Sequence, residues 1–214
     1  MKDKYSIIGP LYDFLAMLYS ANQIDHCKTA MHDRIKPDNR ILFAGVGHGF
    51  DAIKAAERGA KVTVVDLSET MLKRLNGKAE GKEFKHPIRQ INDNILNFDE
   101  YDTYDFVFAN FFLNVFSKGK MVEILDHLTK LAKRKGFVVV GDFSLPNGNV
   151  VARFFQVIYW RIADLIFWVA AQNALHPVYD YASHMKQLGL KVKTIKYYRF
   201  LFDDRYYSIL GQKK

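Results

Sequence analysis

Three glycines and a later aspartate have the spacing with the clearest chemical meaning in this chain. Gly45, Gly47 and Gly49 follow an apolar run. Asp66 ends a second apolar run about twenty positions later. Glycines let the backbone approach a ligand closely, and a carboxylate at that interval can accept hydrogen bonds from both hydroxyls of a ribose. The spacing therefore predicts a site for an adenosine-containing ligand.

The glycine loop departs from the pattern of dinucleotide-binding folds. Nicotinamide and flavin folds use G-x-G-x-x-G, in which a helix N-terminus meets a pyrophosphate. Here the third glycine, Gly49, comes one residue earlier. The loop thus lacks the dinucleotide spacing.

The stretches Ile41 to Gly49 and Asp66 to Leu72 resemble the class I S-adenosylmethionine-dependent methyltransferases. The resemblance extends over roughly residues 36 to 142 and implies S-adenosylmethionine as cofactor, with S-adenosylhomocysteine as product. It also implies that Asp66 holds the ribose and that Asp93 lies near the adenine amino group. By the same resemblance the cofactor-binding residues are Gly45, Val46, Gly47, His48, Gly49, Asp66, Leu67, Met71, Asp93, Asn94 and Asn110.

Two loop residues differ from that family's usual pattern. Phe43 stands two positions before the first glycine, where the family usually has Asp or Glu, so a polar group that helps to order the loop is missing. His48 replaces the usual small residue and would lie close to the methionine end of the cofactor.

Strand and helix patterns alternate through the first two thirds of the chain. This rhythm requires right-handed parallel crossovers and predicts an α/β fold with a doubly wound sheet, whose ligands bind at the carboxyl ends of the strands. The resemblance implies a seven-stranded Rossmann-like sheet that is mostly parallel, with an antiparallel last strand. Strands are expected at 40–44, 61–66, 87–91, 104–110, 136–142, 191–199 and 203–210, and helices at 50–58, 68–76, 118–134 and 178–188.

The length of 214 residues fits one domain. We expect a single methyltransferase domain in four parts. They are an amino-terminal helical cap (1–36), a cofactor-binding core (37–145), an amphipathic helical insert (146–176) and a last helix with a terminal strand hairpin (177–214).

The insert contains the chain's longest apolar segment, residues 150–174. Arg153, Arg161 and Asp164 interrupt it, which argues against a membrane-spanning helix. A helical wheel instead separates polar and apolar sides, as in an amphipathic helix. Three roles are open: a cover over the cleft, an in-plane membrane anchor, or packing at an oligomer interface such as a homodimer.

The net charge of +8 favours anionic partners. An anionic membrane surface fits this charge, while nucleic acid is disfavoured because no zinc-finger, RRM or KH signature accompanies it. The lone Cys27 cannot form an internal disulfide, and no signal-peptide pattern opens the chain, so we expect a cytoplasmic protein, with contact at the inner membrane face left open.

The sequence offers only a few candidate residues for the methyl-transfer step. Methyl transfer from a sulfonium mainly requires that donor and acceptor are held in line and water is excluded. Asn114 could bond an acceptor oxygen or begin a helix, and Asp142 could orient the acceptor or cap the next turn. His48 could be a base or could shape the pocket. The other histidines have no metal-ligand spacing, so we predict no metal site.

The acceptor is suggested by a narrower resemblance. Tyr12-Asp13, the stretch after Asp66 and the aromatic insert are similar to the ubiquinone/menaquinone biosynthesis methyltransferases and the bacterial phospholipid N-methyltransferases. Their acceptors are membrane-soluble, which implies a small hydrophobic or lipid-like acceptor here. The residues expected to contact substrate or membrane are Tyr12, Phe154, Trp160 and Trp168.

Two other functions stay open. One is methylation of a soluble metabolite. The other is a cofactor-binding protein without turnover, suggested by the unusual Phe43 and His48.

Overall fold

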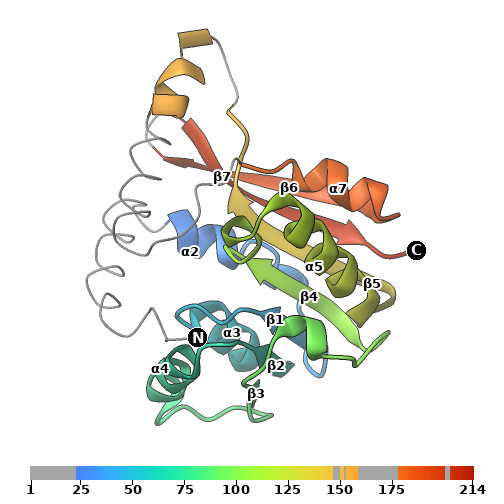
Figure 1. The fold of residues 1–214 in the computed structure, drawn as a ribbon. Helices are drawn as coiled ribbons and strands as arrows, with labels where there is room; N and C mark the ends of the chain where they lie inside the picture. Colours follow the sequence, from blue (N-terminus) through green and yellow to red (C-terminus); the bar gives the residue numbers. More distant parts are fainter. Residues whose placement is uncertain (1–22, 147–149, 152, 159–177, 201–202) are drawn as a thin grey trace.

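The computed structural model describes residues 23–146, 150–151, 153–158, 178–200 and 203–214. Seven strands form one sheet in the order β3-β2-β1-β4-β5-β7-β6, with helices on both faces (Figure 1). All neighbouring pairs are parallel except those made by β7. The strands are β1 (Arg40–Ala44), β2 (Lys61–Val65), β3 (Arg89–Ile91), β4 (Tyr104–Asn110), β5 (Ala132–Phe143), β6 (Lys191–Phe200) and β7 (Asp203–Gln212).

Helices and short 3-10 turns connect these strands. The α-helices are α2 (Gln23–Lys28), α3 (Phe50–Glu57), α4 (Glu69–Ala79), α5 (Lys118–Leu131) and α7 (Tyr181–Gln187). The 3-10 turns are η1 (His32–Arg34), η2 (Ile95–Asn97) and η3 (Leu113–Val115). The predicted doubly wound sheet with an antiparallel last strand is therefore confirmed.

The start of β5 differs from the sequence-based prediction. The helix expected through residue 134 ends at Leu131, and β5 begins at Ala132 instead of residue 136. The pairing of β4 with β5 shifts register between Tyr104 and Phe106, and Lys135 has φ +62°. An irregularity of this kind adds residues to one strand without breaking the pairing, and apolar periodicity alone does not reveal it.

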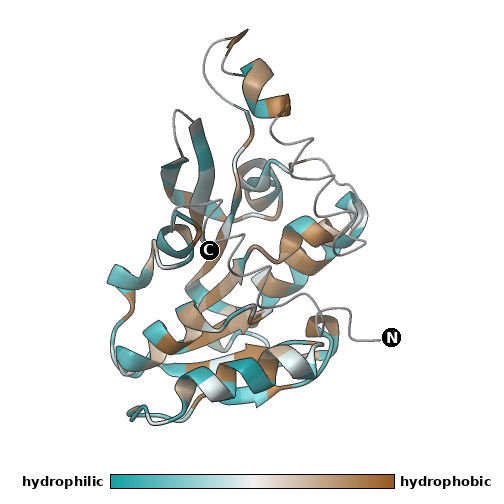
Figure 2. Ribbon diagram, turned by 90° about the vertical axis from the view of Figure 1, so that its left-hand side faces the viewer, coloured by the Kyte–Doolittle hydropathy of each residue, from teal (hydrophilic) through white to brown (hydrophobic). Residues whose placement is uncertain are grey.

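Two apolar clusters, one on each face of the sheet, form the core. Successive residues of a strand point to opposite faces, so Ile41 and Phe43 join one cluster while Leu42 and Ala44 join the other. In Figure 2 the central strands are largely brown, that is apolar, whereas the helices mix brown and teal residues. Burial of β1 on both faces holds the loop that follows it in a fixed place.

Parts of the expected cap and insert lie outside the described residues. Of the cap, α2 and η1 are described, and of the insert, residues 150–151 and 153–158 are helical. In the described part of the chain, none of the helices combines the length and the apolar character needed to cross a bilayer.

Candidate functional site

The glycine loop lies at the carboxyl end of β1, and its three glycines all adopt left-handed backbone conformations. Their φ angles are +73°, +48° and +72° for Gly45, Gly47 and Gly49. Backbone hydrogen bonds brace the loop, from Gly45 N to Val65 O (2.9 Å) and from Gly49 N to Val46 O (2.8 Å). Such φ values are strained for residues with a β-carbon, which explains why glycines stand at these positions.

The space around the three glycines differs. A β-carbon on Gly45 would lie 2.5 Å from Phe112 Cδ2, and one on Gly49 would lie 2.6 Å from Leu75 Cδ1. Among the described residues, a β-carbon on Gly47 would meet only Lys28 Nζ, at 3.8 Å. Gly45 and Gly49 therefore allow close packing within the protein, whereas Gly47 is the loop glycine with room for a ligand to approach.

Asp66 lies beside this loop. Its Oδ2 accepts a hydrogen bond from Val46 N (2.7 Å), and its Oδ1 accepts one from Ser68 N (2.8 Å). The next helix, α4, begins behind Ser68, whose hydroxyl caps it by accepting from Met71 N. The carboxylate is thus held between the loop after β1 and the turn after β2.

The two neighbours predicted with Asp66 are placed differently. Leu67 is 60% exposed, so its side chain offers an apolar surface next to the carboxylate. Met71 is 9% exposed and packs in the apolar cluster of Phe43 and Leu75. Of this pair, Leu67 is placed for direct ligand contact.

Asp93 and Asn94 follow β3 on the far side of Asp66. Asp93 is exposed, and its Oδ1 accepts from Asn94 N (2.6 Å) and Asn97 Nδ2 (2.9 Å). Asn94 caps η2 by accepting from Leu96 N. The turn is joined to the Asp66 turn by a bond from Asn92 Nδ2 to Asp66 O (2.9 Å), so both turns lie at the same edge.

Asn110 ends β4 and bonds to two elements. Its Nδ2 donates to Asp51 Oδ2 (2.8 Å) and to Lys28 O (3.1 Å). The following residue, Phe111, has φ +51°, a strained value for an aromatic residue, and its N donates to Gly141 O (2.7 Å). These bonds join α2, α3 and β4 around the glycine loop.

Lys28 and Asp51 are two further residues of this region that local sequence patterns did not indicate. Lys28 is 8% exposed and Asp51 is 4% exposed, and both lie beside the loop. The signal for Asp51 was its place in the first turn of the helix after the glycines. Lys28 had no comparable signal, because α2 meets the loop only through tertiary packing.

Phe43 and His48, the two unusual loop residues, lie in different environments. Phe43 is buried and stacks on Phe108 with 4.9 Å between ring centroids, so an apolar core contact replaces the missing acid. Burial, together with the charges of Lys28, Lys78 and Arg74, lowers the pKa of His48 to about 4. His48 is therefore neutral at pH 7.

Asp142 and Asn114 form a buried polar cluster with Tyr181. Asp142 is 1% exposed and accepts from Asn114 Nδ2 (3.0 Å), Tyr181 Oη (2.9 Å) and Phe143 N (2.8 Å). Desolvation raises the pKa of the Asp142 carboxyl to about 7, although these donors pull it down. Asp142 thus links β5 to η3 and α7, while the buried Asn114 Oδ1 has no hydrogen-bond partner among the described residues.

The raised pKa of Asp142 predicts how the free energy of unfolding changes with pH. A carboxyl raised from 3.8 to about 7 binds its proton more tightly in the folded state, so its contribution to stability falls as pH rises through that interval. His32 and His48, with pKa values lowered to about 4, act in the opposite direction between about pH 4 and 6.5. We therefore compare the wild type with Asp142→Asn, since the histidines cancel in the difference.

Relative to Asp142→Asn, the wild type should lose about 1.4 kcal/mol of unfolding free energy per pH unit in the steep part of this interval. Urea denaturation at half-unit steps from pH 4.5 to 8 measures the difference. A difference that stays flat above pH 5 would show that Asp142 ionises in its ordinary range.

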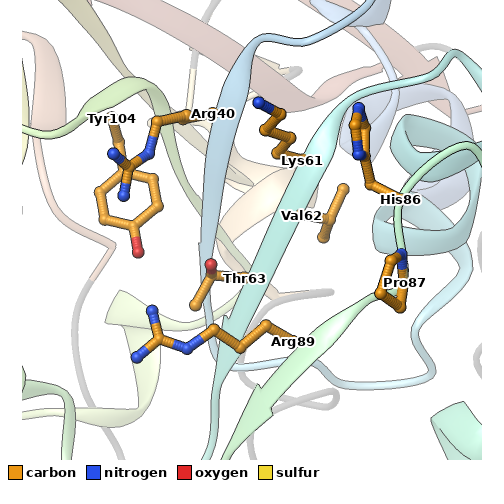
Figure 3. Close-up of a pocket in the computed structure, with 8 residues that line it drawn as sticks. All are labelled: Arg40, Lys61, Val62, Thr63, His86, Pro87, Arg89 and Tyr104. Carbon is orange, nitrogen blue, oxygen red and sulfur yellow. The ribbon is translucent and has the colours of Figure 1, made fainter.

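A pocket of about 330 Å³ lies at the opposite edge of the sheet. Residues at the starts of β1, β2, β3 and β4 line it, with the guanidinium of Arg40 over the Tyr104 ring (Figure 3). Glu100 forms ion pairs with both Arg40 and Arg89 there. Since the glycine loop and Asp66 are at the carboxyl ends of these strands, this pocket is separate from the predicted cofactor site.

The residues predicted to contact substrate or membrane are described only in part. Phe154 is 62% exposed in the helical segment after β5. Tyr12, Trp160 and Trp168 lie outside the described residues.

A family profile and a curated relative are similar to this chain. The family profile described as "Methyltransferase domain" matches residues 41–136, which include the glycine loop, Asp66 and Asp93. A demethylmenaquinone methyltransferase of Clavibacter sepedonicus is 29% identical over 195 residues, covering 88% of this chain and 75% of that protein.

Solved structures share the fold. A 1,6-didemethyltoxoflavin-N1-methyltransferase of Burkholderia thailandensis, with S-adenosylhomocysteine bound, superposes with TM-score 0.70 at 14% identity, over 99% of this chain and 87% of that one. The magnesium protoporphyrin IX methyltransferase of Synechocystis PCC 6803 gives TM-score 0.68 at 17% identity, over 89% and 82%. The profile match, the relative and the shared fold together support a class I S-adenosylmethionine-dependent methyltransferase.

Proposed function

We propose that this enzyme methylates a small hydrophobic acceptor of the quinone-precursor type. The observation that carries the proposal is an apolar surface that follows β5, which we call the apolar patch. Its members Val150, Val151, Phe154 and Phe155 are between 62% and 81% exposed. Exposed apolar patches mark interaction sites. The patch comes after β5 in the chain and is drawn in orange at the top of Figure 1. The carboxyl end of β5 lies at the same edge of the sheet as Asp66 and Asn110.

The relative named demethylmenaquinone methyltransferase supports a quinone-like acceptor. Bound S-adenosylmethionine supplies a methyl group whose bond to sulfur breaks as a bond to the acceptor forms, leaving a neutral thioether. The chain's part in this reaction is to hold the cofactor and acceptor in line and to exclude water. We assign cofactor binding to the predicted residues around Gly47 and Asp66. Asp142 is assigned a positioning role, because it is buried and bonded to Asn114 and Tyr181.

Transfer of radioactive methyl groups tests the acceptor class. The purified protein is incubated with methyl-labelled S-adenosylmethionine and a demethylated quinone, an aminophospholipid or a water-soluble phenol. Label should enter the quinone fraction of an organic extract. Label in the phenol alone would support the soluble-metabolite alternative, and cofactor binding without any transfer would support a binding protein.

We further propose that the apolar patch contacts a membrane surface that holds such an acceptor. The double variant Phe154→Asp with Phe155→Asp should bind anionic vesicles at least about tenfold more weakly than the wild type in a flotation assay, because burial of each Phe stabilises by about 1.5–3 kcal/mol. Tyr101→Asp is the matched control, since Tyr101 is 49% exposed before β4, at the opposite edge. Equal binding by all three proteins would refute membrane contact through this patch and leave the methyl-transfer assay unaffected.

A further inference from the structure

Lys28 is a buried cation at the glycine loop. It is the last residue of α2, which lies beside β7, where Cys27 Sγ donates to Tyr207 O (3.2 Å). The Lys28 side chain is 8% exposed. Its Nζ lies 3.8 Å from the position of a β-carbon on Gly47 and 6.0 Å from the centroid of the Phe111 ring. The ammonium group is therefore located between the glycine loop and the turn after β4.

This ammonium group has no acidic partner in the described parts of the chain. The nearby carboxylate of Asp51 accepts from Asn110 Nδ2 and forms no ion pair with Lys28. A buried charge is costly unless an opposite charge or several hydrogen bonds compensate for it. The Phe111 ring offers only a weak cation–π contact at this distance. The site therefore has the character of a receptor for an anionic group.

The order of the strands indicates which part of the cofactor would reach Lys28. Along the edge of the sheet, Asp93 follows β3, Asp66 follows β2, the glycine loop follows β1, and Asn110 ends β4. Neighbouring strands are about 4.8 Å apart, so this series spans about 14 Å. An extended cofactor with its adenine near β3 and its ribose at β2 places its amino-acid end on the β4 side of the loop. Lys28 lies on that side.

We propose that Lys28 binds the α-carboxylate of the methionine part of S-adenosylmethionine. The inference rests on the cofactor-binding part of the proposed function and is independent of the acceptor. In this position the Lys28 ammonium group attracts the carboxylate of the cofactor, whereas it would repel the positively charged sulfonium. Lys28 would thereby contribute to the orientation of the cofactor as well as to its affinity.

Calorimetry with a cofactor analogue tests this contact. Lys28→Met, which keeps the length of the side chain but removes its charge, should bind S-adenosylhomocysteine about 10- to 100-fold more weakly than the wild type, as expected for loss of a charge-assisted contact. Decarboxylated S-adenosylmethionine lacks the carboxylate, so Lys28→Met should bind it at least as tightly as the wild type does. Lys28→Arg should retain most of the affinity for S-adenosylhomocysteine.

Lys78→Met is the matched control. Lys78 is exposed but close enough to act electrostatically on the same loop, since its charge lowers the pKa of His48. Its loss should change affinity less than twofold. Equal weakening of both ligands in Lys28→Met, or no weakening, would overturn the assignment, and the melting temperature of each variant identifies a folding defect. If the wild type binds neither ligand, the cofactor assignment itself fails, which is a distinct result.

Discussion

Asp66→Asn is expected to weaken binding of S-adenosylhomocysteine by at least 100-fold while the chain remains folded. Both carboxylate oxygens of Asp66 accept backbone hydrogen bonds, from Val46 N and Ser68 N, which hold the carboxylate beside the glycine loop, where the proposed site places the ribose. In Asp66→Asn, an NH2 group replaces one carboxylate oxygen and would face the N–H or O–H group that this oxygen had accepted from. The substitution also removes the negative charge. Loss of two charge-assisted bonds at about 1.5 kcal/mol or more each gives this factor.

Isothermal titration calorimetry measures the effect of Asp66→Asn, with circular dichroism as the check on folding. Asp126→Asn is the control, because Asp126 pairs with Lys130 on the surface of α5, away from the loop. Asp126→Asn should bind S-adenosylhomocysteine with the same affinity as the wild type. If Asp66→Asn binds as tightly as this control, Asp66 does not hold the ribose and the proposed site is wrong.

Gly45→Ala is expected to lower the free energy of unfolding by about 3 kcal/mol or more. Its φ of +73° is strained for alanine, and the new β-carbon would lie 2.5 Å from Phe112 Cδ2. Overpacking of this kind typically costs about 1–3 kcal/mol in addition to the strain. Urea denaturation measures the loss.

Gly81→Ala separates strain from overpacking in this experiment. Gly81 has the same φ of +73°, but no atom in the described ranges lies within 4 Å of its added β-carbon, so its substitution should cost only about 1–2 kcal/mol. Adding Phe112→Ala to Gly45→Ala should restore part of the difference, as a double-mutant cycle would show. Equal losses in Gly45→Ala and Gly81→Ala would mean that Phe112 moves aside at no cost.

Local patterns in the sequence were sufficient for most of the sheet. Strand β1 and the glycine loop, β2 with Asp66, and β4 each combine a run of apolar residues with a distinctive residue at the carboxyl end. Because parallel strands end at one edge, these patterns also placed the predicted residues in one region. The early start of β5 was missed because it depends on the register between β4 and β5.

Contacts between distant segments were not predictable in the same way. Tyr181 reaches Asp142 from 39 positions away, and Asn110 donates to the carbonyl of Lys28 from 82 positions away. The burial that raises the pKa of Asp142 likewise comes from packing against other elements. No periodicity in a single segment records such contacts, since they depend on how α2 and α7 pack on the sheet.

Residues close together in the chain were enough to predict the order of the described strands and helices, the glycine loop and the candidate Asp66. Packing between distant segments was needed to distinguish Gly47, which has room for a ligand, from Gly45, which packs on Phe112, and to place Lys28 at the loop. Burial and electrostatic environment depend on neighbours in space, and it is the folded sheet that brings α2, the loop and the end of β4 together.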